Sequence, residues 1–98
     1  VYSKGKSYAT SNLVLYWLED RKNNNRFGFS ISTKIGKAVV RNKLRRRLKE
    51  IIRHNQDKLK NGYDLVFIAR KPVVELDYHQ IENDVIYLFK KAGIWKKD

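Results

Sequence analysis

Residues 34–53 read KIGKAVVRNKLRRRLKEIIR, and this stretch combines a helical apolar pattern with a dense set of basic side chains. Val40, Leu44, Leu48 and Ile51 recur at spacings of four, four and three, which is typical of the buried stripe of an amphipathic helix. The same stretch carries nine Lys or Arg residues against a single acid, Glu50. The pattern therefore predicts a packed helix with a cationic outer face.

A helical wheel separates these two properties. At a step of about 100° per residue, the four apolar residues fall within about 80°, and a polar arc of about 140° lies opposite. Like charges four residues apart repel by a few tenths of a kcal/mol, so such an arc indicates an anionic partner. The scarcity of acids argues against an ordinary solvated face, and the lack of Trp or Phe anchors argues against a membrane-surface helix. The arc contains Arg41, Asn42, Arg45, Arg46, Lys49 and Arg53, and Lys34, Lys37 and Lys43 add charge beside it.

The composition sets the class of protein. The 98 residues suit one domain, and a net charge of +12 with 42% hydrophobic residues describes a globular protein that attracts polyanions. The chain has no cysteine, which excludes disulfides and thiolate metal sites. Its longest apolar run, Leu13 to Leu18, is too short to cross a bilayer. We expect a cytoplasmic protein whose residues 1–98 form one RNA-binding domain, truncated at its N-terminus.

The rest of the chain predicts a small sheet. Residues 1–12 resemble a turn or the stub of a helix. Residues 13–19 are strand-like and residues 26–32 alternate apolar with small side chains, so the two runs are expected to pair as a hairpin. The basic helix should run from about Ala38 to about Leu59. Residues 63–69 have the unbroken apolar centre of a central strand that is covered on both faces.

A second helix has clear end signals. Asp77 can cap its first turn and Gln80 can complete a capping box, while Gly93 is placed to end it. The predicted fold class is α+β, with a small single-layer sheet flanked by helices. The predicted order is strand, strand, helix, strand, helix. The apolar stripe of this second helix is Ile81, Val85, Leu88 and Ala92.

The sequence resembles a known family, the bacterial ribonuclease P protein component. The Arg-Asn pair inside a basic helix is the most specific part of the match, which spans essentially the whole chain in order and spacing. The matching residues are Arg26, Gly28, Ser30 to Ser32, Lys34, Gly36, Ala38, Val39, Arg41, Asn42, Arg45, Arg46 and Lys49, followed by Ile68 to Pro72.

The resemblance implies a fold and a function. It implies a left-handed strand-helix-strand crossover, against the usual preference. It implies a subunit of a ribonucleoprotein whose RNA subunit uses Mg²⁺ to remove the 5′ leader of precursor tRNA. The expected partners are ribonuclease P RNA and precursor tRNA, with no membrane. RNA contact is implied for Arg41, Asn42, Arg45, Arg46 and Lys49, and a cleft for the single-stranded leader is implied at Tyr2, Tyr16 and Trp95.

Several alternatives stay open from the residues. Tyr16 and Trp95 suit the core or the rim of the protein as well as a cleft, and Ser30 and Ser32 can line the cleft or face water. A ribosomal-type RNA-binding protein would share the charge and layout, and a DNA-binding module would lay the basic helix in a major groove. No catalytic set appears, because His54 and the other histidine are isolated, so we expect the protein alone to be inactive.

Overall fold

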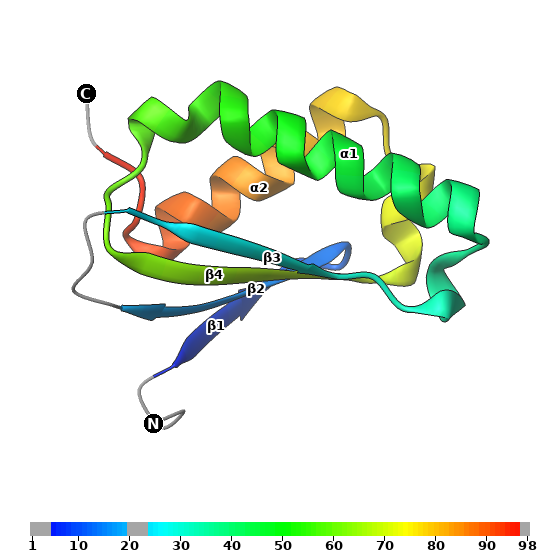
Figure 1. The fold of residues 1–98 in the computed structure, drawn as a ribbon, viewed down its shortest axis with the longest axis horizontal. Coiled ribbons are helices and arrows are strands. Elements are labelled where there is room, and N and C mark those ends of the chain that lie inside the picture. The colour runs from blue at the N-terminus through cyan, green and yellow to red at the C-terminus, as the bar shows by residue number, and fades with distance from the viewer. Residues whose placement is uncertain (1–4, 20–23, 97–98) are drawn as a thin grey trace.

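The computed structural model describes residues 5–19 and 24–96 as one four-stranded sheet with two helices on one side of it (Figure 1). The spatial strand order is β1-β2-β4-β3. This architecture confirms the predicted fold class. The elements are β1 (Lys6–Ala9), β2 (Leu13–Glu19), β3 (Arg26–Ser30), α1 (Ala38–Asn55), β4 (Tyr63–Ala69) and α2 (Tyr78–Ala92).

The predicted hairpin of β2 and β3 is wrong, because β4 lies between these two strands. β2 pairs antiparallel with β4 from Leu13↔Ala69 to Glu19↔Tyr63, and β3 pairs parallel with β4 from Arg26↔Asp64 to Ser30↔Ile68. The strand-like composition of β2 and the alternation in β3 indicate strands, but they do not specify which strand lies beside each of them. β3, α1 and β4 thus form a strand-helix-strand crossover.

The central position predicted for β4 is confirmed, but its coverage on both faces is wrong for the described residues. Leu65 and Phe67 are buried under the helices, whereas Val66 is only half-buried and Ile68 is 39% exposed on the opposite face. That opposite face, which we call the open face, therefore remains accessible to a partner.

Part of the segment 1–12, in which we expected a turn or a helix stub, forms the strand β1. β1 pairs with β2 from Lys6↔Trp17 to Ala9↔Val14. The Thr10 hydroxyl accepts hydrogen bonds from the backbone N–H groups of Asn12 (3.1 Å) and Leu13 (3.0 Å), which closes the tight connection. Small polar residues therefore marked the turn correctly, and the short strand before it was missed.

α1 packs by a stripe that is shifted from the predicted one. Leu44, Leu48 and Ile51 are buried as predicted, but Val40 is 39% exposed. Ile52, which the predicted stripe did not include, is buried as well. The helix also ends at Asn55, before the predicted Leu59, and a 3₁₀ turn follows. The shift arises because the first turn of α1 lies beyond the edge of the core, while its last turns pack directly on the sheet and α2.

α2 begins and ends where the sequence predicts. The Asp77 carboxylate accepts the Gln80 N–H (2.8 Å) and the Gln80 amide oxygen accepts the Asp77 N–H (3.0 Å), which completes the capping box. Gly93 ends the helix with φ of 77°, a left-handed conformation that favours glycine. Phe89 joins the predicted buried stripe and packs edge-on against Phe67, with ring centroids 5.6 Å apart.

Candidate nucleic-acid interface

The basic residues predicted to contact RNA gather on and just before α1, and all of them reach solvent. Arg41 and Arg45 are half-buried and the other members are exposed. The N-terminal members lie in the 3₁₀ turn Thr33–Ile35 and at the N-cap of α1. We call this set the basic face: Lys34, Lys37, Arg41, Asn42, Lys43, Arg45, Arg46, Lys49 and Arg53.

Short-range hydrogen bonds orient two of the guanidinium groups. Arg41 Nε donates to the Gly36 carbonyl (3.2 Å), and Arg45 Nη1 donates to Asn42 Oδ1 (3.1 Å). Gly36 also allows the Val40 side chain to lie close to the backbone, because a Cβ at position 36 would lie 3.1 Å from Val40 Cγ1. The Arg-Asn pair and the glycine before it thus act together to shape the start of the basic face.

The charges of the basic face are not neutralised within the described part of the chain. The ion pair found among those residues joins Arg26 to Asp64 and involves no residue of α1. Like charges four residues apart on this helix repel by a few tenths of a kcal/mol per pair, and an anion bound to them would relieve this repulsion. The basic face can therefore bind a polyanion by direct charge neutralisation.

The open face of the sheet holds two of the residues predicted to line a leader cleft. Tyr16 lies beside Val66 on β4, and Gly28 on β3 lies on the other side of Val66. Ser30 lies two residues after Gly28 on β3, so it is on the same face of the sheet, and it is exposed. A Cβ at Gly5 would overlap the Tyr16 hydroxyl, so Gly5 lies close to this side chain. Tyr16 and Ser30 thus lie on the same face of the sheet, with β4 between their strands.

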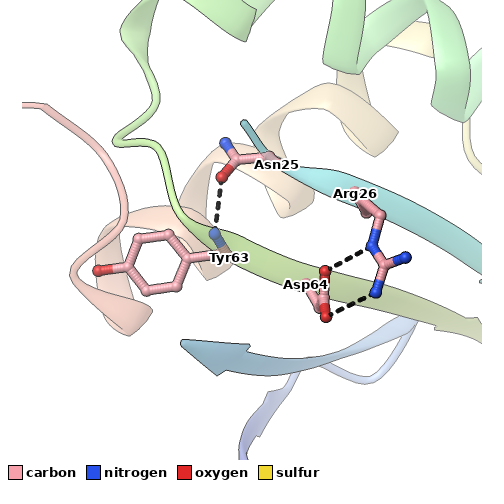
Figure 2. Close-up of polar contacts among 4 residues, drawn as sticks. All are labelled: Asn25, Arg26, Tyr63 and Asp64. Atoms are coloured by element: carbon pink, nitrogen blue, oxygen red, sulfur yellow. Dashed lines mark hydrogen bonds and ion pairs between the residues drawn. The ribbon is translucent and has the colours of Figure 1, made fainter. Parts of the chain in front are cut away.

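At one end of this face, polar contacts fix β3 to β4 (Figure 2). The Arg26 guanidinium donates two hydrogen bonds to the Asp64 carboxylate, at 3.0 and 3.2 Å. Asn25 Oδ1 accepts the Tyr63 N–H (2.9 Å), and Asn25 Nδ2 donates to the Lys60 carbonyl (2.8 Å). These bonds set the register in which Gly28 and Ser30 reach the open face.

Two other cleft candidates, Trp95 and Ser32, lie apart from Tyr16 and Ser30. Trp95 lies past the C-terminal end of α2, where it pairs with Leu59 and its ring lies under the ammonium groups of Lys58 and Lys90, 5.9 and 5.7 Å from the centroid. It packs against the core at that end of the molecule. Ser32 is exposed after β3 has ended, and Tyr2 lies outside the described residues.

Two grooves flank α1, and the sequence did not predict them. One of about 310 Å³ lies between α1 and β3 and includes Phe27 and Phe29. The other, of about 280 Å³, lies between α1 and the segment before α2 and includes the exposed Val39 and Val74. The strand alternation assigned Phe27 and Phe29 to the core. Only the edge position of β3, which depends on the strand order, leaves their rings half-exposed.

Titratable groups elsewhere form a small polar contact between the helices. Burial raises the pKa of Tyr78, and the carboxylates of Glu82 and Glu50 raise it further. The Tyr78 hydroxyl lies 3.3 Å from His54 Nδ1. Among residues 5–19 and 24–96, no three His, Cys, Asp or Glu side chains are grouped so that they could hold a metal ion. The helices in those ranges include none that is long and apolar enough to span a membrane.

Comparisons with known proteins agree with this geometry. The model of the family described as Ribonuclease P matches residues 1–93. The ribonuclease P protein component of Clostridium botulinum strain 657 is 55% identical over 96 residues, which cover 97% of this chain and 86% of that protein. The RNase P protein of Staphylococcus aureus has a similar structure, with a TM-score of 0.88, 31% identity and coverage of 98% of this chain and 88% of that one. The RNase P protein of Thermotoga maritima gives a TM-score of 0.85 at 30% identity, covering 93% and 86% of the two chains.

The family match covers nearly the whole chain, and both the sequence relative and the solved structures align over most of their own length. The basic helix with its Arg-Asn pair and the order β1-β2-β4-β3 lie inside the matched region. The chain belongs to the ribonuclease P protein component family.

Proposed function

We propose that this protein binds the RNA subunit of ribonuclease P through the basic face and the single-stranded 5′ leader of precursor tRNA through the open face. It thereby promotes Mg²⁺-dependent removal of the leader by the RNA subunit. The observation that carries the proposal is the basic face, whose cations project from a helix that is anchored on its other side and have no carboxylate partner among the described residues.

The two surfaces suit the two kinds of RNA. Guanidinium groups bind phosphates in a bidentate manner, which suits the backbone of a folded RNA. The open face offers Tyr16 beside small or aliphatic residues, and an aromatic ring stacks on any base. Leaders differ in sequence between tRNAs, so a surface that tolerates sequence change suits this substrate.

Cleavage belongs to the RNA subunit in this proposal. The proposal assigns no step of the reaction to the protein. The Mg²⁺ ions of the reaction are held by RNA, and the protein contributes positive charge and a binding surface for the substrate. The assembly would work in the cytoplasm, where precursor tRNA is made in bacteria.

Reconstitution with a bacterial ribonuclease P RNA tests the proposal. At low Mg²⁺, where the RNA alone is slow, the protein should restore cleavage of precursor tRNA, and the complex should bind precursor tRNA more tightly than mature tRNA. The protein without the RNA should give no specific 5′ cleavage. Equal affinity for the two tRNAs without restored cleavage would instead favour a ribosomal-type RNA-binding protein, the second candidate.

A matched pair of variants separates the basic face from general charge. Lys43→Ala removes one charge from the basic face, and Lys91→Ala removes one charge from an exposed site at the end of α2. We expect Lys43→Ala to weaken binding of the RNA subunit severalfold and Lys91→Ala to leave it nearly unchanged. Equal losses would mean that net charge alone drives binding, and would contradict a specific basic face.

A further inference from the structure

The groove between α1 and β3 combines aromatic rings with positive charge. It measures about 310 Å³ and opens to solvent beside the C-terminal half of the basic face. Its apolar walls come from two strand residues and one helix residue, and its polar rim comes from the helix and the turn after it. The lining residues are Phe27, Phe29, Ile52, Lys49, Arg53 and Gln56.

The groove exists because β3 is the last strand of the sheet among the described residues. Phe27 and Phe29 point to the helix side of β3, but α1 buries its apolar side chains only as far as Ile52, so both rings stay half-exposed. The Phe29 ring lies nearly parallel to Phe67, at 14° and 6.3 Å between centroids. This stacking against a fully buried ring fixes Phe29, so the groove has a rigid aromatic wall.

The rim has the chemistry of a phosphate site. Lys49 and Arg53 are one helical turn apart, with a rise of about 6 Å between them, and both are exposed. Neither residue forms an ion pair within the described ranges. Gln56 adds an amide that can both donate and accept hydrogen bonds. Two aromatic rings, two cations and one amide thus line the same groove, and these groups suit the base and the phosphates of a nucleotide.

We infer that this groove takes one unstacked base of an RNA strand, with the adjoining phosphates bound by Lys49 and Arg53. The inference rests on the proposed function, since it names what one end of the basic face binds. The base would lie against the ring of Phe27 or Phe29, and Gln56 would meet its polar edge. Specific RNA recognition generally uses splayed bases that stack on aromatic side chains, and this groove provides such a site beside the phosphate contacts.

Charge decides between this occupant and a strand of another protein. The free edge of β3 could pair with an extended peptide, including β3 of a second copy, through backbone hydrogen bonds. A second copy would bring its own Lys49 and Arg53 toward the same rim, and those charges would repel. A nucleotide neutralises the rim and fills the groove beside the strand. Pairing of copies is therefore an outcome of the test below.

The test uses the protein with carbon-13 labelled isoleucine methyl groups and two probes, adenosine 5′-monophosphate and ribose 5-phosphate. The Ile52 methyl signal, assigned with Ile52→Val, should shift with the nucleotide in a saturable way. Ribose 5-phosphate should bind about tenfold more weakly, since it has no base to stack. Equal responses to the two probes, or no response of Ile52 to the nucleotide, would overturn the inference. The inference would also be overturned if sedimentation showed that the protein forms dimers through β3.

Two variants of Phe27 confirm the role of the ring. Phe27→Tyr keeps an aromatic ring and should keep nucleotide binding, whereas Phe27→Leu should weaken it about tenfold with the ribose 5-phosphate response unchanged. If Phe27→Leu fails to fold, the comparison of the two probes on the unchanged protein still decides whether the groove binds a base. Binding of the RNA subunit by the unchanged protein is measured in parallel. Intact RNA binding without any nucleotide response at Ile52 refutes this inference alone, and lost RNA binding refutes the proposed function.

Discussion

At the scale of single residues, Asn42 orients its neighbour as well as facing solvent. Its amide oxygen accepts a hydrogen bond from Arg45 Nη1, which holds the guanidinium against the helix surface. An ordered guanidinium loses less conformational entropy when it binds a phosphate. The pairing of Arg and Asn in this helix thus has a physical basis that charge counting does not supply.

Replacement of Asn42 gives a graded prediction. Asn42→Ala removes the acceptor and should weaken binding of ribonuclease P RNA by a few fold. Asn42→Asp keeps an acceptor for Arg45 but places a negative charge on the basic face, so it should weaken binding more than Asn42→Ala does. Filter binding at constant salt measures both. A better affinity for Asn42→Asp than for Asn42→Ala would show that the orientation of Arg45 matters more than charge.

The Arg46 side chain gives a second prediction at this scale. Arg46 is exposed on the basic face and has no carboxylate partner in the described ranges. Arg46→Ala should lower the slope of log affinity against log salt by about one, as expected when one phosphate contact is lost. Circular dichroism should show an unchanged fold. The slope for the control Lys91→Ala should equal that of the unchanged protein. An unaltered slope for Arg46→Ala would show that Arg46 does not contact the RNA.

At the scale of elements, the sequence predicted the limits of α2 correctly because its end signals are local, whereas α1 ends before the predicted Leu59. Asp77, Gln80 and Gly93 act within a few residues of one another, and all three behave as the sequence predicts. The position of β4 depends instead on contacts between residues 13–19 and 63–69, far apart in the chain. Alternation within β3 placed Phe27 and Phe29 on the helix side of the sheet correctly, but the strand that lies between β2 and β3 is a property of the whole sheet. The sequence did not predict that Phe27 and Phe29 lie on an edge strand, because the strand order depends on the same distant contacts.

The capping box of α2 gives a prediction for stability. Asp77→Ala removes the acceptor for the Gln80 N–H and should lower the free energy of unfolding by about 1 kcal/mol. Urea denaturation measures the change. Glu75→Ala, which removes an exposed acid just before the helix, serves as the control for charge and should have a smaller effect. A matching loss in the two variants would mean that net charge, rather than the cap, explains the change.

At the scale of the whole molecule, the two proposed binding surfaces lie on separate layers. The basic face belongs to the helix layer, and Tyr16 and Ser30 belong to the opposite side of the sheet (Figure 1). The sequence predicted the basic face almost completely, because charge on a helix can be placed from the local pattern. It predicted the open face only in part, because the location of Trp95 depends on the contact of the C-terminal segment with Leu59.

The net charge of +12 gives a prediction for the whole protein. If about five phosphates are neutralised, log affinity for the RNA subunit should fall with log salt with a slope of about −4 to −5. That slope corresponds to a loss of between two and three orders of magnitude from about 50 to about 200 mM salt. Titrations at several salt concentrations test this, and a flat response would exclude an electrostatic role for the basic face.

The place of β4 between β2 and β3 also governs the order in which the chain folds. While the protein is being synthesised, α1 emerges before the strand that joins the two halves of the sheet, and Leu44 and Leu48 have no complete core to pack on until residues 63–69 follow. We expect a fragment that ends at residue 62 to stay protease-sensitive and unfolded by circular dichroism, because non-local strand pairing must precede docking of the helix. We therefore expect a newly made chain to present its cations on an unfolded segment first, and to gain a rigid basic face only after residues 63–69 have joined the sheet.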